Sequence, residues 1–240
     1  MIDEKSAGSF LKYKKTMVKR LYNRILIDDI NLEKKFERYV DNIHDKKIIS
    51  LMLEDINTIH NMSYSYLAEL LFAHPKSIAD IICKYIWQIK SLSTKAYLVP
   101  LILADKKVKN KDLIFLKLYM EFRNSPEYIA PPGKPAPAHI YVRYDNAFSS
   151  ISLKNIISEI VSLLQEPRNA FYLPLTIRKL SKAQNAEVYK LLQKYLNASE
   201  LNPSDFNLPI HTEECYPPYD FMKKQLVEMS QMFLKYYNDK

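Results

Sequence analysis

The sequence contains only two glycines among 240 residues, and this shortage limits the folds that it can adopt. Folds that are rich in β-turns need many positions with positive φ, and glycine is their usual occupant. The two cysteines, Cys83 and Cys215, are too few and too far apart in the sequence to form a disulfide framework. We therefore expect helices that are joined by turns of Asn, Asp, Ser and Pro.

The sequence also lacks the segments that direct a chain into or across a membrane. No apolar run reaches the roughly 18 residues that a transmembrane helix needs, so we expect no membrane insertion. The first ten residues, MIDEKSAGSF, include acidic side chains and no apolar core, unlike a secretory signal. These absences predict a cytoplasmic protein.

Sequence motifs of catalysis are absent as well. The chain has no phosphate-binding glycine loop, no nucleophile elbow, no HExxH and no paired CxxC motif. Four potential metal ligands lie close together at His211, Glu213, Glu214 and Cys215. We interpret them as a chance cluster of surface residues, and we predict neither a metal nor a cofactor. The sequence favours a protein that is not an enzyme.

What the chain does have is apolar residues at three- and four-residue steps, which is typical of amphipathic helices. Before residue 123 these steps predict seven helices, and the last five cover about 45–60, 63–73, 75–89, 94–104 and 110–122. After residue 150 they predict helices over 153–164, 168–183 and 186–196, and a final helix that follows Pro218 and runs through Tyr236. We therefore predict an all-α fold of about ten to eleven helices.

Residues 123–150 interrupt this pattern with a cluster of prolines. The segment holds Pro126, Pro131, Pro132, Pro135 and Pro137, together with Gly133. Proline removes a backbone donor and fixes φ, so we expect no helix to run through the cluster. The sequence thus predicts a helical part over 9–122, a long loop over 123–150 and a second helical part over 151–240, within one continuous domain.

Inside this expected loop, polar and apolar residues alternate from His139 to Asp145, which is a short strand signal. Tyr141, Arg143 and Tyr144 belong to residue types that are enriched at binding hot spots, so they are candidate partner-binding residues. Trp87, the only tryptophan, is a fourth candidate. In the alternative interpretation, the apolar residues of the segment hold the loop against the helices and its polar residues face water; these apolar residues are Ile140, Val142 and Phe148.

A short internal repeat gives a family resemblance. Residues 67–73 and 98–104 carry similar apolar residues at a constant offset of 31, and each segment is followed by a turn and a second apolar helix. Helix pairs that repeat on this scale are typical of α-solenoids, and residues 45–122 resemble HEAT-like repeat proteins. The resemblance implies an irregular stack of helix pairs with a concave surface for a partner; an irregular helical bundle is the alternative. HEAT-like folds also include DNA glycosylases that act on alkylated bases.

The formal charge of +8 and the pI of about 9.2 allow contact with nucleic acid, anionic lipid or an acidic protein. Candidate anion-binding residues occur in two groups, Lys14, Lys15, Lys19 and Arg20 in the first expected helix, and Lys106, Lys107 and Lys109 near the middle of the chain. The alternative is that these side chains are ordinary solvated faces of helices.

Two functions from different classes follow from these observations. The first is a helical scaffold or adaptor, without catalytic activity, that binds a protein or peptide on a concave or loop-covered surface. The second is a nucleic-acid-binding protein, with a HEAT-like base-repair glycosylase as its enzymatic form.

Overall fold

The computed structural model describes residues 57, 85–104, 106, 108–128, 137–206 and 217–238. The chain divides into two compact units, Met1–Lys109 and Asn110–Lys240. The boundary lies just before the helix that follows residue 110, whereas the sequence analysis grouped that helix with the first part of the chain. The expected helices before residue 85 and the first copy of the internal repeat lie outside the described residues.

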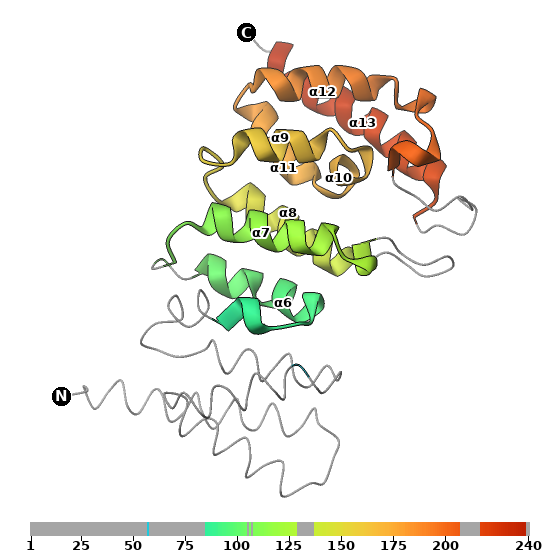
Figure 1. The fold of residues 1–240 in the computed structure, drawn as a ribbon. Coiled ribbons are helices and arrows are strands. Elements are labelled where there is room, and N and C mark those ends of the chain that lie inside the picture. The colour runs from blue at the N-terminus through green and yellow to red at the C-terminus, as the bar shows by residue number, and fades with distance from the viewer. Residues whose placement is uncertain are drawn as a thin grey trace, which may run out of the picture. The chain divides into compact units, whose positions relative to one another are not determined.

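Every regular element in the described part of the chain is helical (Figure 1). It contains eight α-helices and no strand, which confirms the predicted all-α class for these residues. The α-helices are α6 (Leu92–Ala104), α7 (Lys111–Arg123), α8 (Ala138–Ser150), α9 (Ile157–Leu164), α10 (Pro167–Tyr172), α11 (Pro174–Lys182), α12 (Ala186–Leu196) and α13 (Tyr219–Asn238). Four short 3-10 turns accompany them, η1 (Ile86–Gln88), η2 (Pro126–Tyr128), η3 (Ala198–Glu200) and η4 (Pro203–Phe206).

In the first unit, η1 leads into α6. The Asn57 side chain donates to the Gln88 carbonyl at 2.8 Å and accepts from the Lys90 backbone at 2.8 Å. One side chain therefore satisfies two backbone groups in the link before α6. That helix continues through Pro100, whose missing N–H removes one bond from the helical ladder.

The second unit begins with α7 and α8, which pack through aromatic side chains. The Tyr119 ring lies 5.4 Å from Tyr144 and 5.8 Å from Phe148, and Phe122 lies 5.0 Å from Tyr141. All three pairs are edge-to-face, a geometry that adds about 0.5–1.5 kcal/mol per pair beyond the burial of apolar area. The pair of helices is thus held by an aromatic core.

Residues 138–150, which we expected to be loop with a short strand, form the helix α8. The prediction was wrong there because the alternation from His139 to Asp145 spans only seven residues. Over the whole helix the buried positions follow the helical period instead; they are Ile140, Tyr141, Tyr144, Asp145, Ala147 and Phe148. The cluster of prolines ends at Pro137, and α8 begins at the next residue.

Two prolines begin helices in the following segment. Pro167 occupies the first turn of α10, and Pro174 occupies the first turn of α11. The single helix expected over 168–183 is therefore two helices, because Leu173 before Pro174 leaves the helical region with ψ of 46°. Proline at a first turn costs little, since its missing N–H has no partner there.

Asp145 of α8 accepts hydrogen bonds from the start of α11. Its carboxylate is 4% exposed and accepts from the Leu175 backbone at 3.0 Å and the Thr176 backbone at 2.9 Å. The Thr176 hydroxyl also donates to it, at 2.8 Å. A side chain from another helix thus satisfies N–H groups that the first turn of α11 leaves without partners.

The last helix, α13, covers the elements before it. It packs on α10, α11, α12 and η3, and it runs beside α12 in Figure 1. Met222, Leu226, Phe233 and Leu234 are its buried apolar residues. The second unit therefore gains part of its core from packing α13 against helices that begin as early as Pro167.

In the turn after α11, a residue other than glycine adopts positive φ. Gln184 has a left-handed φ of 53°, a conformation that glycine adopts most easily. Its N–H donates to the Ser181 carbonyl at 2.8 Å, and the Asn185 N–H donates to the Leu180 carbonyl at 3.1 Å. These two bonds form a Schellman motif with glutamine at the position usually held by glycine. Asn110, before α7, has the same φ of 53°.

Candidate functional site

Two of the four residues predicted to bind a partner are buried. Tyr141 is 1% exposed and Tyr144 is 0% exposed, because both lie on the inward face of α8. They form part of the aromatic core, and their side chains are not available at the surface. Arg143, on the same helix, is half-buried, and Trp87 is 43% exposed in η1.

Only two of the seven candidate anion-binding residues fall in the described part of the chain. Lys106 and Lys109 are exposed. The others, Lys14, Lys15, Lys19, Arg20 and Lys107, lie outside the described residues, as do His211, Glu213, Glu214 and Cys215. Within the described ranges, no group of three or more His, Cys, Asp or Glu side chains could hold a metal ion.

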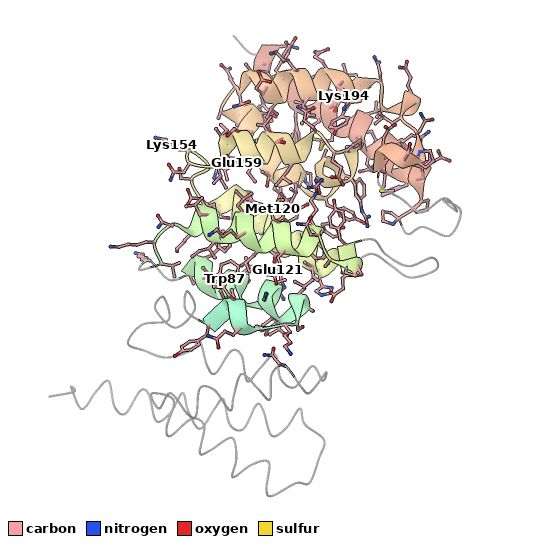
Figure 2. The ribbon with its side chains drawn as sticks, viewed as in Figure 1. Trp87, Met120, Glu121, Lys154, Glu159 and Lys194 are labelled. Carbon is pink, nitrogen blue, oxygen red and sulfur yellow. The ribbon has the colours of Figure 1, made fainter. Side chains whose placement is uncertain are left out.

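The positive charge is unevenly divided between the units. The first unit carries 19 Lys and Arg residues against 13 Asp and Glu residues, and the second carries 16 against 14. The second unit is therefore close to neutral. Its surface mixes both signs, as Figure 2 illustrates with Lys154 and Glu159 on either side of the start of α9 and Lys194 on α12.

Three aromatic side chains of α10 and α13 form a continuous row, which we call the aromatic row: Tyr172, Phe171 and Phe221. The Phe171 ring lies 4.8 Å from Tyr172 and 6.2 Å from Phe221. Phe221 is 48% exposed, and the other two are half-buried. At its inner end, Tyr172 stacks on the buried Tyr141 ring at 3.6 Å, so the row connects the surface with the core. Leu175, which follows Tyr172 by three residues at the start of α11, is also 39% exposed.

Beneath this row, α10 carries a buried amide. Asn169 is 0% exposed, and its Oδ1 accepts from the hydroxyl of Tyr119 at 2.7 Å and from that of Tyr128. Its Nδ2 donates to the Leu163 carbonyl at 2.9 Å and to Glu166 Oε2 at 3.3 Å. Burial is the main reason that the pKa values of both tyrosines lie well above 10, so both remain neutral donors at physiological pH.

Glu166 takes part in the same network. Its Oε2 accepts from Arg123 Nη2 at 2.5 Å and Nε at 3.1 Å, and its Oε1 lies 3.1 Å from the Tyr128 hydroxyl, whose single proton it shares with Asn169 Oδ1. The side chains of Arg123 and Glu166 are 32% and 16% exposed. This ion pair, in which one oxygen accepts from both nitrogens, neutralises the carboxylate and connects the end of α7 to the start of α10.

Arg168 lies on the core side of α10 and is 2% exposed. Its Nη2 donates to the Tyr128 carbonyl, and its guanidinium lies 4.5 Å from the centre of the Tyr128 ring. Its Nε and Nη1 have no hydrogen-bond partner. Burial raises the pKa of Tyr172 to about 12, and the nearby positive charge of Arg168 opposes that rise.

Glu166, Arg168 and Asn169 are site residues that were not predicted from the sequence. Their neighbour Pro167 was interpreted as the end of a helix, and polar residues beside a helix end usually face water. No pattern in the sequence separates a buried polar cluster from a solvated turn. The one available signal was Pro167 itself, which favours a first helical turn as much as a helix end.

None of the helices in the described part of the chain combines the length and the apolar character that crossing a bilayer requires. Comparisons with known proteins gave no match to a family model, to a curated protein or to a solved structure. The resemblance to HEAT-like repeats therefore stays a prediction.

Proposed function

We propose that this chain is a helical scaffold without catalytic activity, which binds a protein or peptide partner. The aromatic row carries the proposal. Phe221, Phe171 and Tyr172 bring three aromatic rings from two helices to one place, with part of each ring open to water. Aromatic side chains dominate binding hot spots because they bury a large area for little loss of conformational entropy.

The partner surface that fits this row is apolar, such as one face of an amphipathic helix. The second unit is nearly neutral, so long-range charge does not select its partner. A short apolar face that covers the three rings gains about 25 cal/mol for each Å² removed from water.

The test is recovery of a partner from native lysate at low salt by the full-length protein, followed by reconstitution with the purified partner. We expect F221A to weaken the reconstituted complex by roughly tenfold or more, as loss of a hot-spot aromatic does. The matched control is I157A, which removes an apolar side chain that is 37% exposed on α9 and outside the row. Recovery of no partner, or equal losses for the two variants, would refute the proposal.

A second candidate function is nucleic-acid binding by the first unit. The observation that favours it is the excess of six basic residues in Met1–Lys109, with Lys106 and Lys109 exposed at its end. Phosphate contacts give an affinity that falls steeply with salt. Mobility shifts with duplex and single-stranded DNA, measured from about 50 mM salt upward, test it. Absence of binding at the lowest salt would end this candidate, and weaker binding by the variant K106E/K109E would support it.

A further inference from the structure

The guanidinium of Arg168 is a buried charge without an ionic partner among the described residues. Nη2 donates to the Tyr128 carbonyl, and a hydrogen bond from Arg168 opposes the rise that burial causes in the pKa of Tyr141, while Nε and Nη1 have no hydrogen-bond partner. The carboxylate of Glu166, two residues before Arg168, is already paired with Arg123. Burying an ion costs several kcal/mol, and proteins usually recover that cost by pairing it. A buried guanidinium on α10 without an ionic partner among the described residues is therefore energetically unfavourable.

The tyrosines around Arg168 differ in how far they are buried. Tyr128 and Tyr141 are each 1% exposed, whereas Tyr172 is half-buried and reaches the surface beside Phe171. Among the tyrosines that Arg168 influences, Tyr172 is therefore the one that a ligand can reach from water. A ligand that enters there meets two aromatic rings first and a buried cation behind them.

We propose that Arg168 is the receptor for a monocarboxylate with an aromatic or apolar body, which contacts Phe171 and Tyr172 while its carboxylate accepts from the unpaired Nη1 of the guanidinium. Guanidinium groups match carboxylates in shape and charge. One negative charge neutralises Arg168, whereas a phosphate dianion would leave an excess charge buried beside Glu166. Tyr172 leaves its stack on Tyr141 to admit the ligand.

The same carboxylate chemistry is offered by a free small molecule and by the C-terminus of a peptide. This site does not depend on the protein or peptide partner proposed above. It is inferred from the buried charge of Arg168, whereas the partner was inferred from the exposed area of the aromatic row. The probes are benzoate for the free molecule, N-acetylphenylalanine for the peptide end, and N-acetylphenylalanine amide as the uncharged control.

The melting temperature of the full-length protein is measured with each probe at constant ionic strength, with chloride as the reference anion. We expect benzoate or N-acetylphenylalanine to raise the melting temperature saturably, by about 5–11 °C at a hundredfold excess over Kd. The amide should have no effect. A larger rise with N-acetylphenylalanine would assign the site to peptide ends, and a larger rise with benzoate would assign it to free acids.

R168M is the decisive variant, and R178M is its matched control, since Arg178 is exposed on α11. The rise should disappear in R168M and persist in R178M. Without ligand, R168M should melt at or above the wild-type temperature, because it removes an unpaired charge while the Tyr128 carbonyl keeps its bond from the Tyr141 hydroxyl at 3.2 Å. A purely structural role for Arg168 predicts a lower melting temperature instead.

A second measurement on the wild-type protein keeps the test independent of whether R168M folds. Photolysis with 4-azidobenzoate should label the tryptic peptide Asn169–Arg178, which contains Phe171 and Tyr172, and excess benzoate should suppress the labelling. The proposal is overturned if no carboxylate raises the melting temperature, if the amide acts equally, or if the label falls elsewhere. A response to inorganic phosphate that exceeds the response to benzoate and needs Arg168 would also overturn it.

Discussion

The Asp145 carboxylate offers the sharpest test of how this fold is held together, because two effects of known sign oppose each other there. Burial at 4% exposure penalises the ionised form. Three hydrogen bonds from Leu175 and Thr176 favour it. Burial is the larger effect and raises the pKa of Asp145 from 3.8 to about 6. Replacement by asparagine keeps the shape of the side chain and removes the titration.

The sign of the pH dependence follows from this direction. Between pH 3.8 and about 6 the folded protein holds a proton on Asp145 that the unfolded chain has lost. The free energy of unfolding contributed by this group is therefore greatest below pH 3.8 and falls as the pH rises through about 6. At 1.36 kcal/mol for each pKa unit, the fall amounts to about 3 kcal/mol.

Urea unfolding of the wild type and D145N from pH 3.5 to 7.5 measures this effect, and the difference between the two cancels titrations elsewhere in the chain. We expect the wild type to lose about 3 kcal/mol relative to D145N across this range, with the midpoint of the loss between the two pKa values. The unfolding signal should come from the second unit, since separate unfolding of the two units would distort a two-state fit. A wild type that gains stability relative to D145N as the pH rises would refute the reasoning, because the three hydrogen bonds would then outweigh burial.

Three further substitutions test other parts of the second unit by urea unfolding. N169A removes a buried amide with four hydrogen-bond partners and should cost about 2–4 kcal/mol, whereas N146A, at an exposed position on α8, should cost less than about 0.5 kcal/mol. Q184G removes the strain of a glutamine with left-handed φ, and it also removes the exposed hydrogen bond from Gln184 to the Tyr236 carbonyl. The net effect should be to raise the free energy of unfolding by about 0.5 kcal/mol. The same change in the helix interior, Q193G, should instead destabilise by about 1 kcal/mol; equal effects would contradict the assigned strain. N185A removes the cap that accepts from the Val188 backbone at 3.0 Å and should cost about 1 kcal/mol, and no loss would show that water replaces the cap.

The sequence predicted the helices that have long amphipathic patterns and clear ends. The helix expected over 110–122 is α7 at 111–123, and the helix expected over 186–196 matches α12. Both expose polar side chains on one face, so the helical period is visible along their whole length. Sequence reasoning failed over 138–150 because the prolines before it suggested a loop and a seven-residue window fits a strand period as well as a helical one.

The candidate site was beyond the reach of the sequence for a different reason. Tyr141 and Tyr144 are common residue types at interfaces, but their burial depends on α7, whose Tyr119 and Phe122 cover them. The exposed aromatic row joins α10 to α13, which are separated by α11, α12 and two 3-10 turns. Only tertiary packing decides which of the many aromatic residues reach the surface together.

The position of α13 has a consequence for synthesis on the ribosome. Because α13 covers α10, α11 and α12, a nascent chain that has exposed residues 110–206 still presents the apolar faces that this helix will occupy. At translation rates of about 5–20 residues per second, those apolar faces stay exposed for seconds before α13 is synthesised and can pack on them. Chaperones that bind apolar segments have their opportunity during that delay, and a premature stop before Tyr219 would make the exposure permanent.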